Sequence, residues 1–165
     1  MQIYLINNKS EEIKSISKIY IDSWKITYKN LVSDEYLNSL NYSDAEKKWT
    51  KFLNNEKNFI FVAEQNNEIV GFVAGCIDDK NLEGQLYAIY VNPTLKNLGI
   101  GSKLLARFFD YIKQNNMTKV IVWAMSENKN TISYYKHKGA VEYDHRMNNF
   151  DGEIVEDTAL IWKNI

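Results

Sequence analysis

The chain contains 165 residues, of which 45% are hydrophobic and 25% are charged, and its formal net charge is −1. These proportions are typical of a folded protein, and the charge balance gives no reason to expect nucleic acid or an anionic membrane as a partner. The single cysteine, Cys76, excludes an internal disulfide and a cysteine-based metal cluster. We interpret it as a buried small hydrophobe and expect no metal site. The sequence shows no signal-peptide pattern and no run of about 18 apolar residues, so we predict one cytoplasmic domain over residues 1–165.

Helical patterns follow a short strand in the first third of the chain. Residues 3–6 have a strand pattern, and apolar residues at helical spacing begin after Ser10, which we take as an N-cap. Ser33 and Ser43 predict the starts of two shorter helices, because each is a cap-type residue followed by acidic residues that suit the helix dipole.

Strand patterns dominate the middle of the chain. Residues 59–64 and 69–77 predict an antiparallel hairpin with its turn at residues 66–67. A further apolar strand is expected at residues 86–91. Apolar residues at helical spacing then predict a helix that ends near Gln114.

The last third alternates again between strands and a helix. Gly139 suits a helix C-terminus, and Asp151 with Gly152 forms a hairpin-turn signal. The expected elements are a strand at 120–124, a helix at 131–138 and strands at 141–147 and 154–162. This order predicts an α/β (α+β) fold with a mixed sheet and helices over it.

Residues 86–105 carry the strongest functional signal from local pattern. A strand, a turn containing Gly99 and Gly101, and a helix start follow one another there. Unpaired N–H groups at a helix start bind anions, and glycines let a phosphate approach the backbone. We therefore expect a phosphate-bearing ligand at residues 96–102. A dinucleotide-binding turn would need a third glycine where Leu104 stands, and a P-loop needs a longer spacing, while a turn without ligand stays open.

A second segment, residues 127–140, reads ENKNTISYYKHKGA. Together with the glycine turn it resembles the GCN5-related N-acetyltransferase (GNAT) superfamily of bacterial type. The family's acetyl-CoA motif, Gln/Arg-x-x-Gly-x-Gly/Ala, corresponds to residues 96–101. Its later motif, Asn-x-x-Ala-x-x-(Phe/Tyr)-Tyr-x-x-x-Gly-Phe, is matched at Asn128, Tyr134, Tyr135 and Gly139. The chain departs from these motifs at three positions, Lys96, Thr131 and Ala140.

This resemblance implies a GNAT fold, with a mostly antiparallel sheet of about seven strands, about four flanking helices and splayed fourth and fifth strands. It implies acetyl-CoA as co-substrate. The pyrophosphate would bind the turn and helix start, at Lys96, Asn97, Leu98, Gly99, Ile100, Gly101 and Ser102. The pantetheine arm would pair with the strand edge, at Ile89, Tyr90 and Val91.

Two further residues take roles from the resemblance. Asn128 would bind the amides of the arm, and Tyr135 would donate a proton to the departing thiolate. A phenol suits this role because its reference pKa of about 10 keeps it protonated at neutral pH.

The proton acceptor is left open by the sequence. Gln85 stands where many family members carry a glutamate, and an amide cannot take a proton. Candidate bases are the nearest acids by sequence, Asp78, Asp79 and Glu83, and the two histidines, His137 and His145. An acidic loop is the plainer interpretation of the acids, and we name no base.

Transfer of an acetyl group to a primary amine of a small molecule or peptide, by direct attack in a ternary complex, is therefore expected. The alternative is a non-catalytic module that binds or senses CoA thioesters, which the missing glutamate favours. A homodimer is left open. Aromatic residues of the first helices cover the acceptor site in this family, and one or two of these are expected to line it: Trp24, Tyr28, Tyr36, Tyr42 and Trp49.

Overall fold

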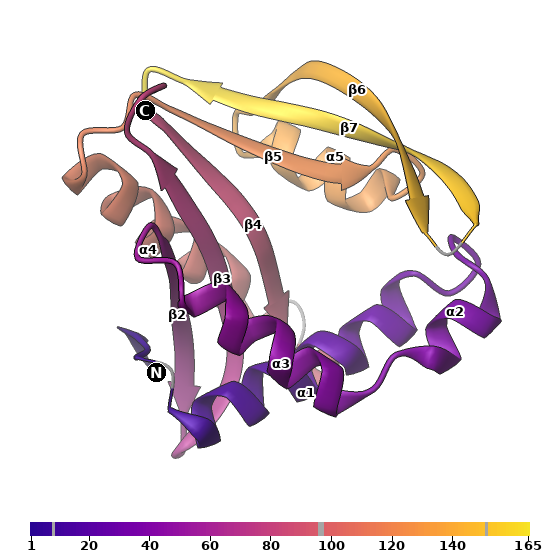
Figure 1. The fold of residues 1–165 in the computed structure, drawn as a ribbon. Coiled ribbons are helices and arrows are strands. Elements are labelled where there is room, and N and C mark those ends of the chain that lie inside the picture. Colours follow the sequence, from indigo (N-terminus) through magenta and orange to yellow (C-terminus); the bar gives the residue numbers. More distant parts are fainter. Residues whose placement is uncertain (8, 96–97, 151) are drawn as a thin grey trace.

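A computed structural model describes residues 1–7, 9–95, 98–150 and 152–165. One seven-stranded sheet runs through the molecule in the order β1-β2-β3-β4-β5-β7-β6 (Figure 1). The strands are β1 (Gln2–Leu5), β2 (Asn58–Gln65), β3 (Glu68–Asp78), β4 (Glu83–Val91), β5 (Lys119–Met125), β6 (Val141–Phe150) and β7 (Glu153–Lys163). The helices are α1 (Ser10–Thr27), α2 (Asp34–Ser39), α3 (Tyr42–Leu53), α4 (Ile100–Gln114) and α5 (Lys129–His137). The predicted mixed α/β fold is confirmed, with one α-helix more than the four expected within the described residues.

Strand pairing in the sheet is antiparallel except between β4 and β5. Helix α4 joins β4 to β5 and supplies the crossover that a parallel pair requires. The predicted β2–β3 hairpin is confirmed, and Asn66 and Asn67 in its turn have φ of 54° and 62°, which asparagine tolerates better than most residues. In the β6–β7 hairpin Gly152 has φ of 92°, and Asp151 lies outside the described residues.

Strands β4 and β5 diverge in the middle of the sheet, as expected from the sequence (Figure 1). Their pairing ends where Leu86 meets Val122, although β4 continues to Val91 and β5 to Met125. A β-bulge at Tyr87 adds one residue to β4 relative to β3. Because a bulge bends its strand, this residue helps to turn β4 away from β5.

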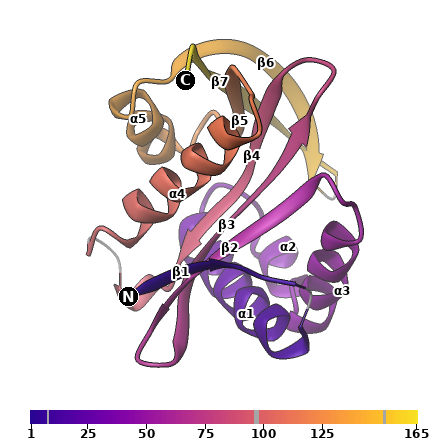
Figure 2. The same ribbon diagram turned by 90° about the vertical axis from the view of Figure 1, so that its left-hand side faces the viewer.

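Helices cover both faces of the sheet. Figure 2 shows α4 and α5 on one side and α1, α2 and α3 on the other. Phe108 and Leu104 of α4 fill the first core, and Trp49 of α3 packs with Phe72 in the second. No helix in the described part of the chain is long and apolar enough to cross a membrane.

Two of the three serine N-caps expected from the sequence are wrong. Lys9 occupies the cap position of α1, and Ser10 is the first helical residue. In α3 the cap is Asn41, whose side chain accepts the N–H of Asp44 at 2.9 Å. Asparagine caps as well as serine does, so the earlier polar residue ends the extended segment and Ser43 becomes helical. Ser33 caps α2 as predicted.

Cys76 differs from its predicted environment. The residue is half-buried, not buried, because the last three residues of β3 extend beyond the best-covered part of the sheet. Its Sγ lies 3.7 Å from Oε1 of Gln85 on β4.

Candidate active site

The glycine turn leads into helix α4 as predicted. Gly99 occupies the N-cap position with φ of 76°, a left-handed conformation that favours glycine. A Cβ placed on Gly101 would meet only Val91, at 3.8 Å, so the space beside this backbone is open. The buried side chain of Ile100 anchors the first turn in the core, and the backbone amides at this helix start have no partner within the helix.

A cleft of about 430 Å³ extends from this turn between β4 and β5 to α5. We call it the β4–β5 cleft. It brings together nine of the predicted cofactor residues: Ile89, Tyr90, Val91, Gly99, Ile100, Gly101, Ser102, Asn128 and Tyr135. Leu98 is exposed and does not line the cleft, while Lys96 and Asn97 lie outside the described residues.

The edge of β4 that faces this cleft is not paired with β5 beyond Leu86. Strands β4 and β5 therefore leave a stretch of backbone, residues 87–91, along the cleft wall. An extended, amide-bearing ligand can bind such an edge as an added strand does.

Helix α5 contributes Asn128 and Tyr135 to the far end of the cleft. The Asn128 side chain caps α5 by accepting the N–H of Thr131 at 3.3 Å. Tyr135 is 4% exposed and packs edge-on against Trp162. Burial first, and the nearby Tyr28 and Tyr134 second, raise the pKa of Tyr135 above its usual value, so its hydroxyl is a proton donor at neutral pH.

Tyr28 follows α1 and connects the cleft with a second cavity. Its ring lies 4.1 Å from that of Trp24, and it lines both cavities. Burial raises the pKa of Tyr28, whereas its hydrogen bonds with Tyr90 and Asn128 lower it. The hydroxyl is therefore held at the point where the two cavities meet.

The second cavity, of about 290 Å³, is the aromatic pocket. Its aromatic walls are Tyr20, Trp24, Tyr28, Tyr36, Tyr87, Tyr90, Trp123 and Phe150, and its polar side chains are Lys48, Gln85, Arg146, Asn148 and Asp157. The two cavities share six lining residues at the divergence of the strands: Tyr28, Tyr87, Ala88, Tyr90, Trp123 and Ala124. Three of the aromatic residues expected at an acceptor site therefore line this pocket, while Trp49 is fully buried in the core and Tyr42 is exposed.

Asp157 is the only carboxylate among the described residues that line either cavity. It is 5% exposed, and its Oδ2 accepts from Nε of Arg146 at 3.2 Å and from Nδ2 of Asn148 at 3.1 Å. Within the described residues, Oδ1 has no hydrogen bond. The sequence alone gives no local sign of this position for Asp157, which directly precedes the apolar run TALIW.

Comparison with known proteins identifies the family of this chain. Residues 15–140 match the Acetyltransferase (GNAT) family. The chain belongs to the GNAT family. An uncharacterised N-acetyltransferase of Bacillus subtilis, YuaI, is 35% identical over 95% of this chain and 91% of its own length. The resemblance seen in the sequence and the predicted acetyltransferase class are thereby confirmed.

Solved structures of GNAT proteins share the fold. The PaiA N-acetyltransferase of Thermoplasma acidophilum, in complex with coenzyme A, superposes with a TM-score of 0.78 at 20% identity and 99% coverage of both chains. YncA of Salmonella typhimurium, with its cofactor acetyl-CoA, gives a TM-score of 0.74 at 16% identity, covering 100% of this chain and 94% of that one. Both neighbours therefore bind CoA or its acetyl thioester in the same fold.

The GNAT chain has an amide, Gln85, in the wall of the aromatic pocket. The acids nearest to it in sequence lie outside both cavities. Glu83 pairs with Lys119 at 3.3 Å, Asp78 accepts from Nδ2 of Asn81 at 2.6 Å, and Asp79 pairs with Lys57. These three acids belong to an ion-paired and hydrogen-bonded surface, as the plainer interpretation had it.

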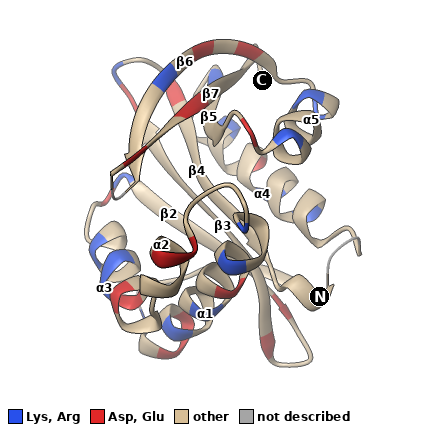
Figure 3. Ribbon diagram, turned by 90° about the vertical axis from the view of Figure 1, so that its right-hand side faces the viewer, with Lys and Arg blue, Asp and Glu red and all other residues tan. Residues whose placement is uncertain are grey.

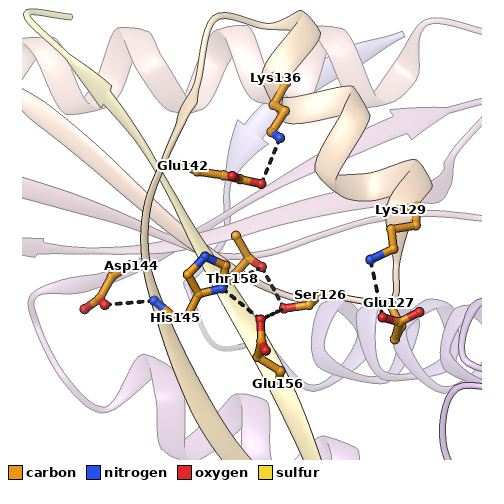
Figure 4. Close-up of polar contacts among 9 residues, drawn as sticks. All are labelled: Ser126, Glu127, Lys129, Lys136, Glu142, Asp144, His145, Glu156 and Thr158. Atoms are coloured by element: carbon orange, nitrogen blue, oxygen red, sulfur yellow. Dashed lines mark hydrogen bonds and ion pairs between the residues drawn. The ribbon is translucent and has the colours of Figure 1, made fainter.

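The two histidines of this GNAT chain also lie outside the cavities. His145 on β6 is exposed, with Nδ1 at 2.8 Å from Oε1 of Glu156, and Ser126 bonds Glu156 and Thr158 beside it (Figure 4). Glu156 precedes Asp157 on β7, so the two side chains point to opposite faces of the sheet. His137 ends α5 and is exposed. Neither histidine reaches the aromatic pocket, and no described group of His, Cys, Asp and Glu is arranged for a metal.

Proposed function

We propose that this chain transfers an acetyl group from acetyl-CoA to a primary amine of a small molecule or peptide, by direct attack in a ternary complex. The observation that carries the proposal is the junction of the β4–β5 cleft with the aromatic pocket at Tyr28, Tyr87 and Tyr90. A thioester in the cleft and an amine in the pocket would meet there, so no covalent enzyme intermediate is required.

Acetyl-CoA suits the cleft along its length. The free amides of the α4 start and the open space at Gly99 and Gly101 favour a pyrophosphate. Lys96 and Asn97 stay predicted ligands of the same group. The unpaired edge at Ile89 to Val91 favours the pantetheine arm, and the amide N–H₂ of Asn128 is a further donor to it.

The reaction needs one proton acceptor and one proton donor. The amine must lose a proton before its nitrogen bonds the thioester carbon, because an alkylammonium has a reference pKa of about 10.4. We assign this proton to Oδ1 of Asp157, directly or through water. As the C–S bond breaks, the Tyr135 hydroxyl donates its proton to the departing thiolate, and the second proton that the acetylated nitrogen loses restores the Tyr135 hydroxyl through solvent.

A non-catalytic CoA-thioester sensor is the second candidate function. Gln85 favours it, since the carboxylate found there in many family members is missing. The position of Asp157 favours the enzyme instead, because it returns one carboxylate to the pocket.

Release of free thiol from acetyl-CoA, measured over polyamines, amino acids, aminoglycosides and peptide N-termini, tests the proposal. We expect at least one amine class to give turnover well above hydrolysis. Tight binding of acetyl-CoA with no turnover for any amine would favour the sensor.

A further inference from the structure

The aromatic pocket contains a cation without an acidic partner. Nζ of Lys48, on α3, donates to the Tyr20 hydroxyl at 2.8 Å. It lies 4.4 Å from the ring centroid of Tyr20, 5.2 Å from that of Trp49 and 5.6 Å from that of Tyr87. In the described part of the chain no carboxylate is within ion-pair distance of Lys48, and burial of the ammonium is the cause that lowers its pKa.

The other two charges that line the pocket neutralise one another. Nε of Arg146 donates to Asp157, and the guanidinium also lies 4.2 Å from the Trp123 ring centroid. These residues belong to β5, β6 and β7, whereas Lys48 comes from the helical layer on α3 (Figure 3). Lys48 is therefore the uncompensated charge among the described lining residues.

Such a cation is unfavourable in the free protein. A half-buried ammonium loses hydration, and the ring faces of Tyr20, Trp49 and Tyr87 offset only part of that loss. Burial lowers the pKa of Lys48 to about 8, which leaves the group mostly protonated at neutral pH. An anion that enters the pocket would restore the missing interaction.

We propose that the acceptor carries a carboxylate in addition to its amine, and that this carboxylate binds Lys48 in the aromatic pocket. The inference rests on the proposed acetyltransferase function and specifies its substrate class. One unpaired cation balances one negative charge, as on a carboxylate, whereas a phosphate monoester carries nearly two. An acceptor that carries an ammonium but no carboxylate is repelled by the like charge of Lys48, so the pocket selects against such an acceptor. The ring-lined walls favour an apolar or aromatic side chain on such a carboxylate-bearing acceptor.

Matched pairs of acceptors test the proposal, and each pair consists of an amino acid and its decarboxylated amine. The pairs are phenylalanine with phenethylamine, tryptophan with tryptamine, and methionine with 3-(methylthio)propylamine. We expect the wild type to prefer the amino acid in kcat/KM. Lys48→Met is expected to lose roughly tenfold to hundredfold for the amino acid, mainly in KM, because a charge-assisted contact is removed. The same variant is expected to use the decarboxylated amine as well as the wild type or better.

Two further variants control the measurement. Lys47→Met changes the neighbouring lysine of α3, which is exposed and pairs with Asp44 at 3.2 Å, and should keep the wild-type preference. Lys48→Arg keeps the positive charge and should retain most of the preference for the amino acid over its decarboxylated amine. Equal use of both members of every pair by the wild type, or an equal loss on both in Lys48→Met, would overturn the proposal.

Binding of 3-phenylpropionate to the CoA-loaded protein, followed by calorimetry, separates this inference from the proposed function. This anion has no amine and needs no turnover. We expect binding to the wild type and to Lys47→Met, and loss in Lys48→Met. Absence of turnover with all amines would count against the acetyltransferase, whereas binding that is unchanged in Lys48→Met would count against Lys48.

Discussion

Tyr134 and Tyr135 are neighbours on α5 and both line the β4–β5 cleft, yet their hydroxyls differ. Tyr135 is near Tyr28 at the junction of the cavities, whereas the Tyr134 hydroxyl is buried with no hydrogen-bond partner in the described residues. Tyr135→Phe is expected to lower kcat about tenfold to hundredfold, because a thiolate is a fair leaving group and needs only part of the usual assistance from an acid. Steady-state kinetics together with calorimetry of acetyl-CoA should show the loss in kcat with an unchanged Kd.

Tyr134→Phe is the matched control for this prediction. It removes a hydroxyl from the same helix and cleft without removing a hydrogen bond, so kcat should change little. Equal kcat in Tyr135→Phe and the wild type would remove Tyr135 from the mechanism.

Asp157 carries the second prediction at the scale of single residues. Asp157→Asn keeps the size of the side chain and removes the proton acceptor, so kcat/KM near pH 7 should fall about a hundredfold. The loss in kcat/KM should shrink as pH rises toward the pKa of the amine, since the amine substrate then loses its proton to solvent without help from the protein. Glu156→Gln, on the opposite face of the same strand, should leave the pH profile of kcat/KM unchanged. A parallel profile for Asp157→Asn and the wild type would exclude Asp157 as the proton acceptor.

Residues of the candidate site differ in how well the sequence predicts their positions. The position of Tyr135 and Gly101 in the β4–β5 cleft was predictable, because each belongs to a short motif. The position of Asp157 in the aromatic pocket was not, because the fold brings Arg146, Asn148 and Tyr28 to it from other elements. A carboxylate whose neighbours come from distant parts of the chain has no local signature.

The strand–turn–helix unit of β4, the glycine turn and α4 presents backbone to the cleft. Gly101→Arg is expected to weaken acetyl-CoA binding more than about a hundredfold, because the long side chain would occupy space that a pyrophosphate needs. The fold should tolerate the change, since a Cβ at this position meets only Val91 at 3.8 Å. Calorimetry with acetyl-CoA, beside a thermal melt of each protein, measures both effects.

Gly101→Ala controls for the loss of glycine itself. The methyl group has room in the free protein, so binding should weaken much less than in Gly101→Arg. Wild-type affinity in Gly101→Arg would exclude the α4 start as the pyrophosphate site.

Elements were predicted well where a repeating pattern specifies them and poorly where neighbours compete. The apolar spacing of α4 predicted its end near Gln114, and the residues at that spacing are buried: Ile100, Leu104, Leu105, Phe108 and Ile112. The start of α3 was misplaced because Asn41 and Ser43 are both good caps, and propensity alone does not rank them. The bulge at Tyr87 has no signature in the run LYAIYV, since it follows from how β4 pairs with β3.

At the scale of the whole molecule, the candidate active site lies between two parts of the sheet. Strands β1 to β4 carry the helical layer of α1 to α3, and β5, β7 and β6 form the other wall. The order of elements was readable from the sequence. The aromatic pocket was readable only in part, because Tyr20 and Lys48 come from helices and Tyr87 and Phe150 from strands, and only the packing of these helices on the sheet brings them together.

Lys48 makes the stability of the whole molecule depend on pH in a specific way. Its pKa is lowered to about 8 in the fold, against an ordinary value near 10.5, so the unfolded chain binds the proton more tightly. Burial raises the pKa of the Tyr20 hydroxyl, which accepts the Lys48 hydrogen bond, and also raises the pKa of Tyr87, whose ring lies 5.6 Å from Nζ. The unfavourable contribution of Lys48 is therefore complete below pH 8, shrinks as pH rises and vanishes above about 10.5.

Lys48→Met should accordingly raise the free energy of unfolding at pH 7 by about 1–2 kcal/mol, less than the roughly 3 kcal/mol of the pKa shift alone, because the variant also loses the cation–ring contacts. The gain over the wild type should fall steadily between pH 8 and 10. Urea titrations of both proteins at pH 7, 8, 9 and 10 measure this difference, with Lys47→Met as the exposed control that shows no such trend. If the difference in free energy of unfolding between Lys48→Met and the wild type does not vary with pH, Lys48 is not a desolvated cation. Such a result would also count against a carboxylate-bearing acceptor.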